Sequence, residues 1–501
     1  MSPASPLLVG DLIRRNARAA ARRPAASLAG QVVSHGELDL AANRVAWALR
    51  GLGLGPGDRV VAWADTCLEQ LVLFAGMAKH GAVFAPLDAR LGPAEAIDVA
   101  RIARPHLIVA DAPRAAAAGP VAEALGVRAA RLGRLEGEDD PAALLYAGGR
   151  SDDYAEPRLA ETDPHVMFFT SGSTGRPKAV VISHRANTLR SFQGVFRDVP
   201  EISVCMFPLF HMAGFTLALS AWQTRGELAV VPGANADAIL DAVVRRRANR
   251  LYCIPSIWKR ILAADPRRVD TSSLRELDTG TSAVPQELLL ELKAVFPGTT
   301  TRIYYGSTEC GSAAALPDAD VLRKPGSVGP PSPGVDLRIS DAGEILVRSA
   351  YLMDGYFEDP VATGAALRDG WFYTGDLGEL DDEGYLRVVG RIKEVIRTGG
   401  ESVAPAEVEA ALADHPAVAE VAVVGIPDPQ WGEIVCAVVV AARGAAPTLP
   451  DLQKHTEGRI AGFKKPRRLE LVDALPRTPA TGQVQRTILV QRIAMREPAS
   501  G

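Results

Sequence analysis

The first part of the chain alternates between two hydrophobic periods, and this alternation constrains the fold most. The stretches 38–52 and 68–80 repeat apolar residues at helical spacing. The segments 59–64, 82–87 and 106–110 are short apolar runs typical of buried strands. Helices that alternate with buried strands predict parallel sheets covered by helices on both faces. With 501 residues the chain exceeds one hydrophobic core, so we expect two or more domains.

The second part of the chain changes character. The segment 112–160 is poor in apolar pattern, and we expect it to form a surface connection. After Gly334 short strand patterns joined by turn sequences predict a small antiparallel unit at 337–339, 344–348 and 385–389.

The last hundred residues read as a separate α+β domain. Its predicted elements are a helix at 405–413, strands at 418–424 and 434–440, and a helix at 448–459. We expect the tail after Arg496 to be disordered.

Residues 166–181 contain the strongest functional signal. An apolar run at 166–169 predicts a buried strand. It is followed by small hydroxyl and glycine residues and a lysine, namely Thr170, Ser171, Gly172, Ser173, Thr174, Gly175 and Lys178. Glycines let backbone N–H groups turn toward an anion, hydroxyls add donors, and the lysine adds charge. The segment predicts a phosphate loop, although not of the GxxxxGK[ST] type; taken alone, a flexible turn is the alternative.

Two later blocks place carboxylates beside tight turns. In the block 304–309, YYGSTE, an aromatic ring can face a base and Glu309 could hold a divalent cation. The block 371–376 ends in Thr-Gly-Asp, so Asp376 could accept both hydroxyls of a ribose. Taken alone, each block also fits an ordinary turn with a solvated carboxylate.

Charge and cysteine usage exclude several classes of function. The net charge of −4 and the pI of about 6.1 give no general attraction to nucleic acid or to an anionic membrane. No segment is long and apolar enough for a membrane span. The five cysteines are scattered without a CxxC pair, which indicates a reducing compartment, the cytoplasm, and argues against structural zinc. The arginine-rich start resembles a transit peptide only faintly, and Leu8, Leu12 and Ile13 favour a first surface helix.

Taken together, in this order and at these distances, the blocks resemble the adenylate-forming superfamily of acyl-CoA synthetases, adenylation domains and luciferases. Stand-alone acyl-CoA ligases are the most similar group. The resemblance runs from 81–88 to 475–478. It implies an α/β N-terminal domain over 1–390, with doubly wound sheets and a small antiparallel β unit. It also implies a hinge at 391–393 and a small mobile α+β domain over 394–501.

The resemblance also implies ATP (or AMP), Mg²⁺ and CoA as cofactors and assigns roles to residues. Thr170 to Lys178 would hold the β- and γ-phosphates, and Asp376 with Arg391 would hold the ribose. The block Tyr304, Tyr305 and Gly306 would hold adenine, with Tyr305 stacked on it. Thr308 would contact the α-phosphate, and Glu309 would bind Mg²⁺.

Further roles concern the acid and the thiol. Gly280, Thr281 and Ser282 would form a wall of the carboxylate pocket, and His211 would lie beside the acyl group. The alternative for His211 is a neutral imidazole that only packs. Lys393 matches the hinge residue, and Gly399 and Gly400 match the segment that lines the pantetheine tunnel.

One position departs from the family pattern. The family usually carries a lysine that bridges the substrate carboxylate and the α-phosphate, and the matching residue here is Gln483 if the match is anchored on Gly482. A glutamine brings no charge, so we expect adenylation to slow by roughly 10²–10³-fold and thioester formation to be spared. Three interpretations stay open: a variant that uses an acyl-adenylate from a partner enzyme, a full ligase with a substitute cation, or an introduced substitution.

The expected substrate is an apolar carboxylic acid, or its acyl-adenylate. The segment 208–214 contains no acidic residue to hold an α-amino group, and Met212, Ala213 and Phe215 favour an apolar acid. No carrier-protein segment follows, which favours CoA as the acceptor. The alternatives are a stand-alone acyl-adenylate synthetase that loads a carrier protein, and a non-catalytic adenylate-binding relative. Retention of Glu309 and Asp376 speaks against the last.

Overall fold

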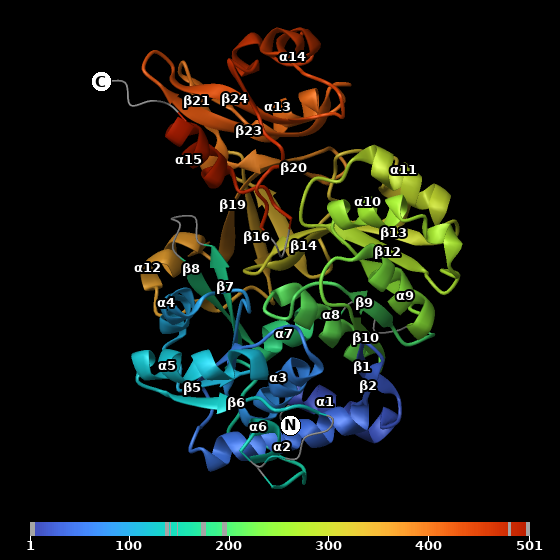
Figure 1. The fold of residues 1–501 in the computed structure, drawn as a ribbon, viewed down its shortest axis with the longest axis vertical. Coiled ribbons are helices and arrows are strands. Elements are labelled where there is room, and N and C mark those ends of the chain that lie inside the picture. The colour runs from blue at the N-terminus through green and yellow to red at the C-terminus, as the bar shows by residue number, and fades with distance from the viewer. Residues whose placement is uncertain are drawn as a thin grey trace. The chain divides into compact units, whose positions relative to one another are not determined.

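The computed structural model describes residues 6–135, 140, 142–147, 149–171, 177–192, 198–478 and 482–496, and Figure 1 shows their elements. The chain divides into two compact units. Unit 1 comprises 1–325, 332–336 and 348–372, and unit 2 comprises 326–331, 337–347 and 373–501. The predicted domain limits at 390 and 393 stay predictions. The expectation for the tail concerns residues 497–501, which lie outside the described residues.

The larger sheet of unit 1 has eight strands in the order β14-β13-β12-β11-β9-β10-β1-β2. Its inner pairs are parallel, and antiparallel pairs close both edges. The strands are β1 (Pro24–Leu28), β2 (Gln31–Ser34), β9 (Ile202–Cys205), β10 (Glu227–Val230), β11 (Arg250–Tyr252), β12 (Glu276–Gly280), β13 (Thr300–Ser307) and β14 (Gly311–Leu316).

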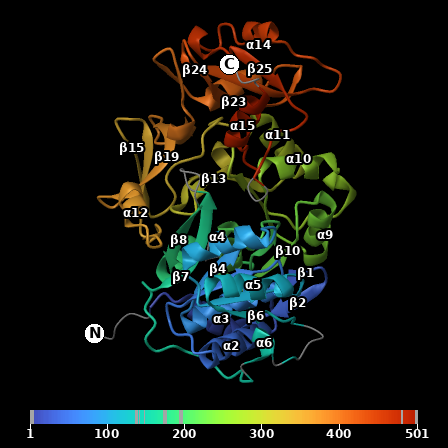
Figure 2. The ribbon, with the colours of Figure 1, turned by 60° about the vertical axis from the view of Figure 1, so that its left-hand side comes forward.

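The second sheet of unit 1 has seven strands in the order β17-β8-β7-β4-β3-β5-β6. Figure 2 shows β7 and β8 as a long antiparallel pair beside the parallel strands. The strands are β3 (Arg59–Trp63), β4 (Val83–Leu87), β5 (Leu107–Ala110), β6 (Arg128–Arg131), β7 (Pro164–Ser171), β8 (Pro177–Ser183) and β17 (Gly355–Tyr356). Every residue of β4 is buried, as expected for a central strand covered on both faces.

The helices of unit 1 bury apolar side chains, except α12, in which no residue is buried. They are α1 (Val9–Ala20), α2 (His35–Gly51), α3 (Leu68–His80), α4 (Pro93–Ala103), α5 (Ala115–Leu125), α6 (Leu144–Ala147), α7 (His184–Arg190), α8 (Met212–Gln223), α9 (Ala236–Arg246), α10 (Pro255–Ala263), α11 (Gln286–Val295) and α12 (Pro360–Ala366). Almost every side chain of α3 is buried, so this helix lies inside the unit rather than on its surface.

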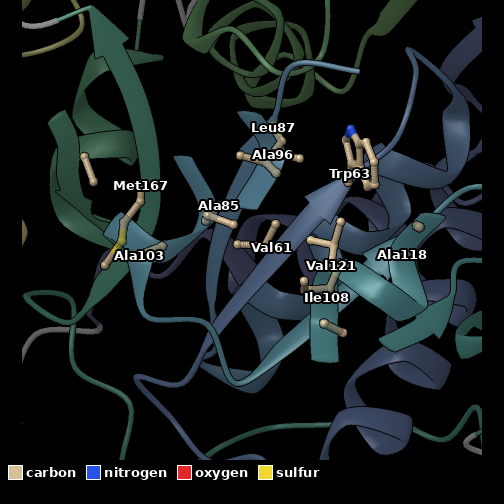
Figure 3. Close-up of a cluster of buried hydrophobic side chains, with 14 of the residues drawn as sticks. Val61, Trp63, Ala85, Leu87, Ala96, Ala103, Ile108, Ala118, Val121 and Met167 are labelled. Atoms are coloured by element: carbon tan, nitrogen blue, oxygen red, sulfur yellow. The ribbon is translucent and has the colours of Figure 1, made fainter. Parts of the chain in front are cut away.

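The prediction of a surface connection over 112–160 is wrong for its first part. This part contains the helix α5 and the strand β6, and β6 extends the second sheet because it pairs in parallel with β5. Figure 3 shows Ala118 and Val121 of α5 packed in one core cluster with Val61 and Ile108. An alanine-rich helix has a weak hydrophobic period, and the strand that follows has only two alanines between two arginines and lies at a sheet edge. Neither produces the pattern of a buried element.

Unit 2 contains two smaller sheets. The first is ordered β15-β16-β19-β18, with β20 paired to β19, and most of its residues belong to unit 2. Its strands are β15 (Val335–Ile339), β16 (Glu344–Ser349), β18 (Leu367–Arg368), β19 (Trp371–Leu380) and β20 (Leu386–Arg391). The antiparallel pairs of β19 with β18 and β20 agree with the predicted small antiparallel unit.

The second sheet of unit 2 is ordered β22-β21-β24-β23, with β25 paired to β24. Its strands are β21 (Ile396–Thr398), β22 (Glu401–Val403), β23 (Val418–Asp428), β24 (Gly432–Ala441) and β25 (Arg468–Leu471), with helices α13 (Pro405–Leu412), α14 (Leu449–His455) and α15 (Arg486–Arg496). A mixed α/β fold with a large N-terminal part and a smaller C-terminal part confirms the predicted fold class. In the described part of the chain, every helix is too short or too polar to cross a membrane.

Candidate active site

Four neighbouring parallel strands of the large sheet end at the same edge, and predicted site residues follow their carboxyl ends. The strands are β9, β11, β12 and β13, which lie side by side in the sheet. His211 comes after β9, Gly280 ends β12, and the block that begins at Tyr304 ends β13. Ligands of open parallel sheets bind at this edge. The topology therefore brings together residues that are almost one hundred positions apart in the sequence.

The base of the predicted phosphate loop is an antiparallel hairpin. Thr170 on β7 pairs with Lys178 on β8, and Ser171 pairs with Pro177. Of the other predicted loop residues, Gly172, Ser173, Thr174 and Gly175 lie outside the described residues. The hairpin nevertheless fixes where Lys178 emerges from the sheet.

Lys178 and Glu309 contact the same tyrosine from different sides. The Nζ atom of Lys178 lies 4.5 Å from the centroid of the Tyr356 ring, a cation–π distance. The Tyr356 hydroxyl donates a hydrogen bond of 3.2 Å to Oε1 of Glu309. Burial and the adjacent Glu309 carboxylate raise the pKa of Tyr356, so the phenol stays protonated and remains a donor.

The turn that carries Thr308 and Glu309 is held by hydrogen bonds from Arg190, the last residue of α7. The guanidinium donates to the carbonyl oxygens of Thr308 (2.7 Å), Glu309 (2.9 Å) and Tyr351 (2.8 Å). Burial lowers the pKa of Arg190 to about 10, so the side chain stays charged at neutral pH. The hydroxyl of Ser307 accepts from the Glu309 N–H at 3.2 Å and completes the turn.

The nucleotide block on β13 depends on close backbone contacts. A β-carbon at Gly306 would lie 1.9 Å from the carbonyl oxygen of Gly311, so only glycine fits this position. Burial raises the pKa of Tyr304 to about 12. Its ring lies 5.9 Å from that of Tyr252 at the end of β11. Tyr305 pairs with Ala314 of β14, and the register shifts directly after it.

The predicted carboxylate wall contains a strained residue. Gly280 has a φ of +151°, and a β-carbon there would lie 2.2 Å from the Tyr304 carbonyl oxygen. Thr281 follows with a φ of +66°, and its hydroxyl donates to the Gly280 carbonyl oxygen at 2.6 Å. A β-branched residue rarely adopts positive φ, and such strain costs about 1–3 kcal/mol and clusters at functional sites. Ser282 comes next, in the turn after β12.

His211 is the N-terminal cap of α8. Its Nδ1 accepts a hydrogen bond of 3.2 Å from the Ala213 N–H, which leaves the neutral ring protonated on Nε2. Burial lowers the pKa of His211 to about 4. The ring stacks with Phe207 at 6.3 Å, and Phe207 contacts Tyr252 edge-on at 5.4 Å. A neutral imidazole in an aromatic row suits an apolar neighbour.

In unit 2, Asp376 and Arg391 face each other across a strand pair. They are register partners on β19 and β20, and Nε of Arg391 lies 3.1 Å from Oδ1 of Asp376. The Thr374 hydroxyl accepts from the Asp376 N–H at 3.1 Å and donates to the Ile345 carbonyl at 2.8 Å. The predicted ribose carboxylate is therefore held in a defined orientation.

The predicted hinge and tunnel residues lie on short exposed turns of unit 2. Lys393 is exposed in a 3₁₀ turn at Ile392–Glu394. Gly399 and Gly400 form the two-residue loop between β21 and β22, with φ values of +60° and +85°. Positive φ at both positions is the conformation of a type I′ hairpin turn. The Gly399 N–H donates to the Trp431 carbonyl at 2.8 Å, and a β-carbon at Gly399 would lie 2.8 Å from the Trp431 ring.

Gln483 lies in a loop that closes on itself through its backbone. Its carbonyl accepts from the Thr478 N–H at 2.7 Å, and its own N–H donates to the Thr478 hydroxyl at 3.1 Å. Gly482, just before it, has a φ of +67°, which favours glycine. Three residues later Arg486 begins α15, and its guanidinium contacts Glu394 (3.0 Å) and Glu409 (2.7 Å).

Comparison with known proteins identifies the family. Residues 13–357 match the model "AMP-binding enzyme", and residues 407–481 match "AMP-binding enzyme C-terminal domain". The chain belongs to the AMP-binding enzymes. This confirms the predicted adenylate-forming family and the predicted enzyme class, an AMP-forming acid–thiol ligase of the acyl-CoA synthetase type.

Individual relatives of this AMP-binding enzyme match over most of its length. Indoleacetate–CoA ligase of Aromatoleum aromaticum is 35% identical over 486 residues, which cover 92% of this chain and 93% of that protein. Feruloyl-CoA synthase of an Amycolatopsis species is 33% identical over 482 residues, with 93% and 95% covered. The crystal structure of ATP-bound MatB from Rhodopseudomonas palustris matches with a TM-score of 0.87 and 30% identity, over 96% and 98% of the chains.

The donor set of this AMP-binding enzyme fits a nucleotide-bound magnesium ion. Within the described residues, no three histidine, cysteine or acidic side chains cluster as a metal site. Magnesium that is bound with a nucleotide takes most of its ligands from phosphates and water and needs only one or two carboxylates. The single carboxylate of Glu309, on a backbone fixed by Arg190, meets that requirement.

Sequence reasoning missed Tyr356 and Arg190, which contact predicted site residues, and Arg486, which pairs with Glu394 next to the predicted Lys393. Tyr356 follows a glycine in an ordinary Gly-Tyr pair, and Arg190 ends a short helix. Both are far from Glu309 in sequence, by 47 and 119 positions. Neither residue type nor sequence position marks Tyr356 or Arg190 as part of the site.

Proposed function

We propose that this chain activates an apolar carboxylic acid with ATP and transfers the acyl group to CoA. A carboxylate oxygen attacks the α-phosphorus, and the bond to the pyrophosphate leaving group breaks. The thiol then attacks the carbonyl carbon of the acyl-adenylate, and AMP leaves. One observation carries the proposal. Lys178 and Glu309, from two distant motifs, both contact Tyr356, and the turn that carries Glu309 is held by the buried Arg190.

The nucleotide roles follow from the chemistry of the residues in unit 1. The first step brings two anions together, so positive charge and oriented donors are its main requirement. We assign the β- and γ-phosphates to Thr170 and Lys178 with the loop 171–175, and the α-phosphate to Thr308. Adenine is assigned to the block Tyr304, Tyr305 and Gly306. When bound at Glu309, Mg²⁺ would neutralise phosphate charge.

The acyl roles rest on the aromatic row beside the strained turn. Gly280, Thr281 and Ser282 would face the carboxylate, and the neutral ring of His211 would lie beside the acyl group. Two of the most similar relatives are named for indoleacetate and feruloyl substrates, which both carry an aromatic ring. The aromatic rings of Phe207 and Tyr252 support an apolar substrate.

The roles in unit 2 concern ribose, movement and the thiol. Asp376 with Arg391 would take the ribose hydroxyls, because Arg391 contacts the carboxylate and Thr374 holds the backbone of Asp376. Lys393 would be the hinge residue between the two half-reactions. Gly399 and Gly400 would line the path of the pantetheine arm, where the absence of side chains leaves the backbone accessible.

We further propose that Gln483 slows the adenylation step. The two cations nearest to it in sequence are already engaged, because Arg477 contacts Glu420 at 2.6 Å and Arg486 contacts Glu394 and Glu409. These pairings argue against either arginine as a substitute for the missing lysine. Loss of one charged contact to the reacting oxygens costs about 3 kcal/mol, or roughly 10²–10³-fold in rate.

Mass spectrometry of the thioester product tests both proposals. The protein receives CoA with either free acids plus ATP or pre-made acyl-adenylates; indoleacetic, ferulic and fatty acids cover the apolar range. Slow product from free acid and fast product from the adenylate are expected. Product only on a carrier protein would favour the carrier-loading alternative, and no product from any input would favour a non-catalytic adenylate binder. Product only from the adenylate would mean that another enzyme performs the first step.

A further inference from the structure

Tyr356 stands between the two opposite charges that the proposed function uses on ATP. Lys178 lies over the ring, and Glu309 accepts from the hydroxyl. We call Lys178, Tyr356 and Glu309 the tyrosine bridge. Among the described residues no ion pair joins Lys178 directly to Glu309, although both side chains contact Tyr356.

The position of Tyr356 is fixed independently of both charges. In the register of β17 and β8, Tyr356 pairs with Val180, which places it diagonally opposite Lys178 on the same face. The Tyr356 N–H donates to the Thr363 hydroxyl at 2.9 Å. The backbone that carries the ring is therefore held by the sheet and by Thr363 of α12, independently of Lys178 and Glu309.

The same segment also fixes the backbone of Glu309. The Met353 N–H donates to the Glu309 carbonyl at 2.7 Å, and Arg190 donates to the same oxygen at 2.9 Å. The Tyr356 hydroxyl then engages one carboxylate oxygen, Oε1. The side chain is thereby oriented, and its second oxygen is left to meet a cation.

We propose that Tyr356 is a positioning residue that keeps Lys178 and Glu309 apart and orients the Glu309 carboxylate. A direct ion pair between lysine and glutamate would neutralise both charges before ATP and Mg²⁺ arrive. A phenol between them prevents that pairing, because its ring attracts the ammonium and its hydroxyl satisfies one carboxylate oxygen. The proposal rests on the assigned roles of Lys178 on phosphate and Glu309 on the metal.

The two functions of Tyr356 can be separated by substitution. Tyr356→Phe keeps the ring that Lys178 contacts and removes only the hydroxyl. Tyr356→Ala removes the spacer, so Lys178 and Glu309 can pair directly. Tyr351→Phe is the matched control, because the Tyr351 hydroxyl donates to a backbone carbonyl, that of Ser312 at 3.1 Å, and to no side chain in the described part of the chain.

Calorimetric binding of ATP, with EDTA and with Mg²⁺, measures both functions without turnover. The ratio of the two dissociation constants is the metal enhancement. In Tyr356→Phe we expect this enhancement to fall roughly three- to tenfold with ATP binding in EDTA unchanged, as for the net loss of one typical intramolecular hydrogen bond. In Tyr356→Ala both the metal enhancement and the affinity for ATP in EDTA should fall. In Tyr351→Phe neither should change. Melting temperatures without ligand check that each variant is folded.

Glu309→Gln tests the proposed metal role of Glu309 separately from the proposed role of Tyr356. Loss of the metal enhancement in Glu309→Gln, with both Tyr356 variants like the native protein, would overturn the role of Tyr356 and leave the metal role intact. An unchanged enhancement in Glu309→Gln would overturn the metal role on which the inference rests.

Discussion

The predicted site residues of unit 1 and those of unit 2 are held in different ways. In unit 1 the Thr308–Glu309 turn rests on the buried guanidinium of Arg190, and Thr281 is kept in a strained conformation. In unit 2, Lys393 and the Gly399–Gly400 turn are exposed on short elements. Gln483 lies in a loop that bonds to its own backbone.

This difference separates two ways of building a site. Unit 1 fixes charges and dipoles in advance, which lowers the reorganisation that a charged transition state requires. Unit 2 holds Asp376 and Arg391 on paired strands but presents Lys393, Gly399 and Gly400 on turns, where a change of backbone angles at one position alters the exposed surface. The account therefore predicts strong, packing-dependent effects from substitutions in unit 1 and step-specific effects from substitutions in unit 2.

The largest effect is expected for Arg190→Met. Three carbonyls would lose a charged donor, so we expect the free energy of unfolding to fall by about 3 kcal/mol or more and adenylation to fall at least about a hundredfold. Arg190→Lys should retain part of both. Urea unfolding and pyrophosphate exchange measure the two quantities. The control is Arg185→Met. Arg185 lies on the same helix as Arg190, and its substitution removes a half-exposed ion pair with Glu161. Equal losses in the two methionine variants would contradict the account.

A step-specific effect is expected at the glycine turn of unit 2. Gly399→Ala brings a β-carbon to 2.8 Å from the Trp431 ring, whereas a β-carbon at Gly400 meets nothing within 4 Å. Both positions carry positive φ, so the variants share the conformational cost and differ in the clash. We expect thioester formation from a pre-made adenylate to fall about tenfold more in Gly399→Ala, with pyrophosphate exchange unchanged in both. Equal rates of thioester formation in the two variants would contradict a role for the close contact between residue 399 and Trp431.

The smallest effect concerns acid. In unit 1 the rings of His165 and His184 stack at 4.5 Å, and burial lowers the pKa of His184 to about 3 and that of His165 well below its usual value. Folding therefore favours the neutral rings, and this contribution to stability is present above pH ~6.5 and is lost as pH falls below it.

In unit 2 the hydrogen bonds from Arg459 and His455 lower the pKa of Asp414 to about 2, so its contribution is lost only below pH ~3.8. Between pH 6.5 and 4, unit 1 should weaken first. In a Trp431→Phe variant the remaining tryptophans all belong to unit 1, and we expect the urea midpoint of their fluorescence to fall by roughly 1 M from pH 7 to 4.5. His184→Gln should flatten this dependence, and a pH-independent midpoint would contradict it.

Much of the fold could be predicted because its strands are buried on both faces. Segments such as 60–64 and 82–87 are apolar at every position, and a run of this kind is typical of a strand buried on both faces. The helix α5 was missed because alanines bury well but carry little hydrophobic contrast. Its burial depends on the neighbouring β5 and α4, which no local pattern reports.

The site could be predicted only where its chemistry is contiguous in sequence. The run from Thr170 to Lys178 and the block ending in Glu309 announce phosphate and metal chemistry by residue type and spacing. Tyr356 and Arg190 act through contacts that exist only after the sheets assemble, so their types and positions carry no separate signal. Sequence therefore indicated the residues proposed to meet the ligand better than the residues that hold them.

The most direct test of the central claim compares the native chain with Gln483→Lys in the two half-reactions. Pyrophosphate exchange measures adenylation from the free acid, and thioester formation from a pre-made adenylate measures the second step. The account predicts that Gln483→Lys raises adenylation by roughly 10²–10³-fold and leaves thioester formation unchanged. Equal adenylation rates in the two proteins would contradict the claim and would mean that another group replaces the missing lysine.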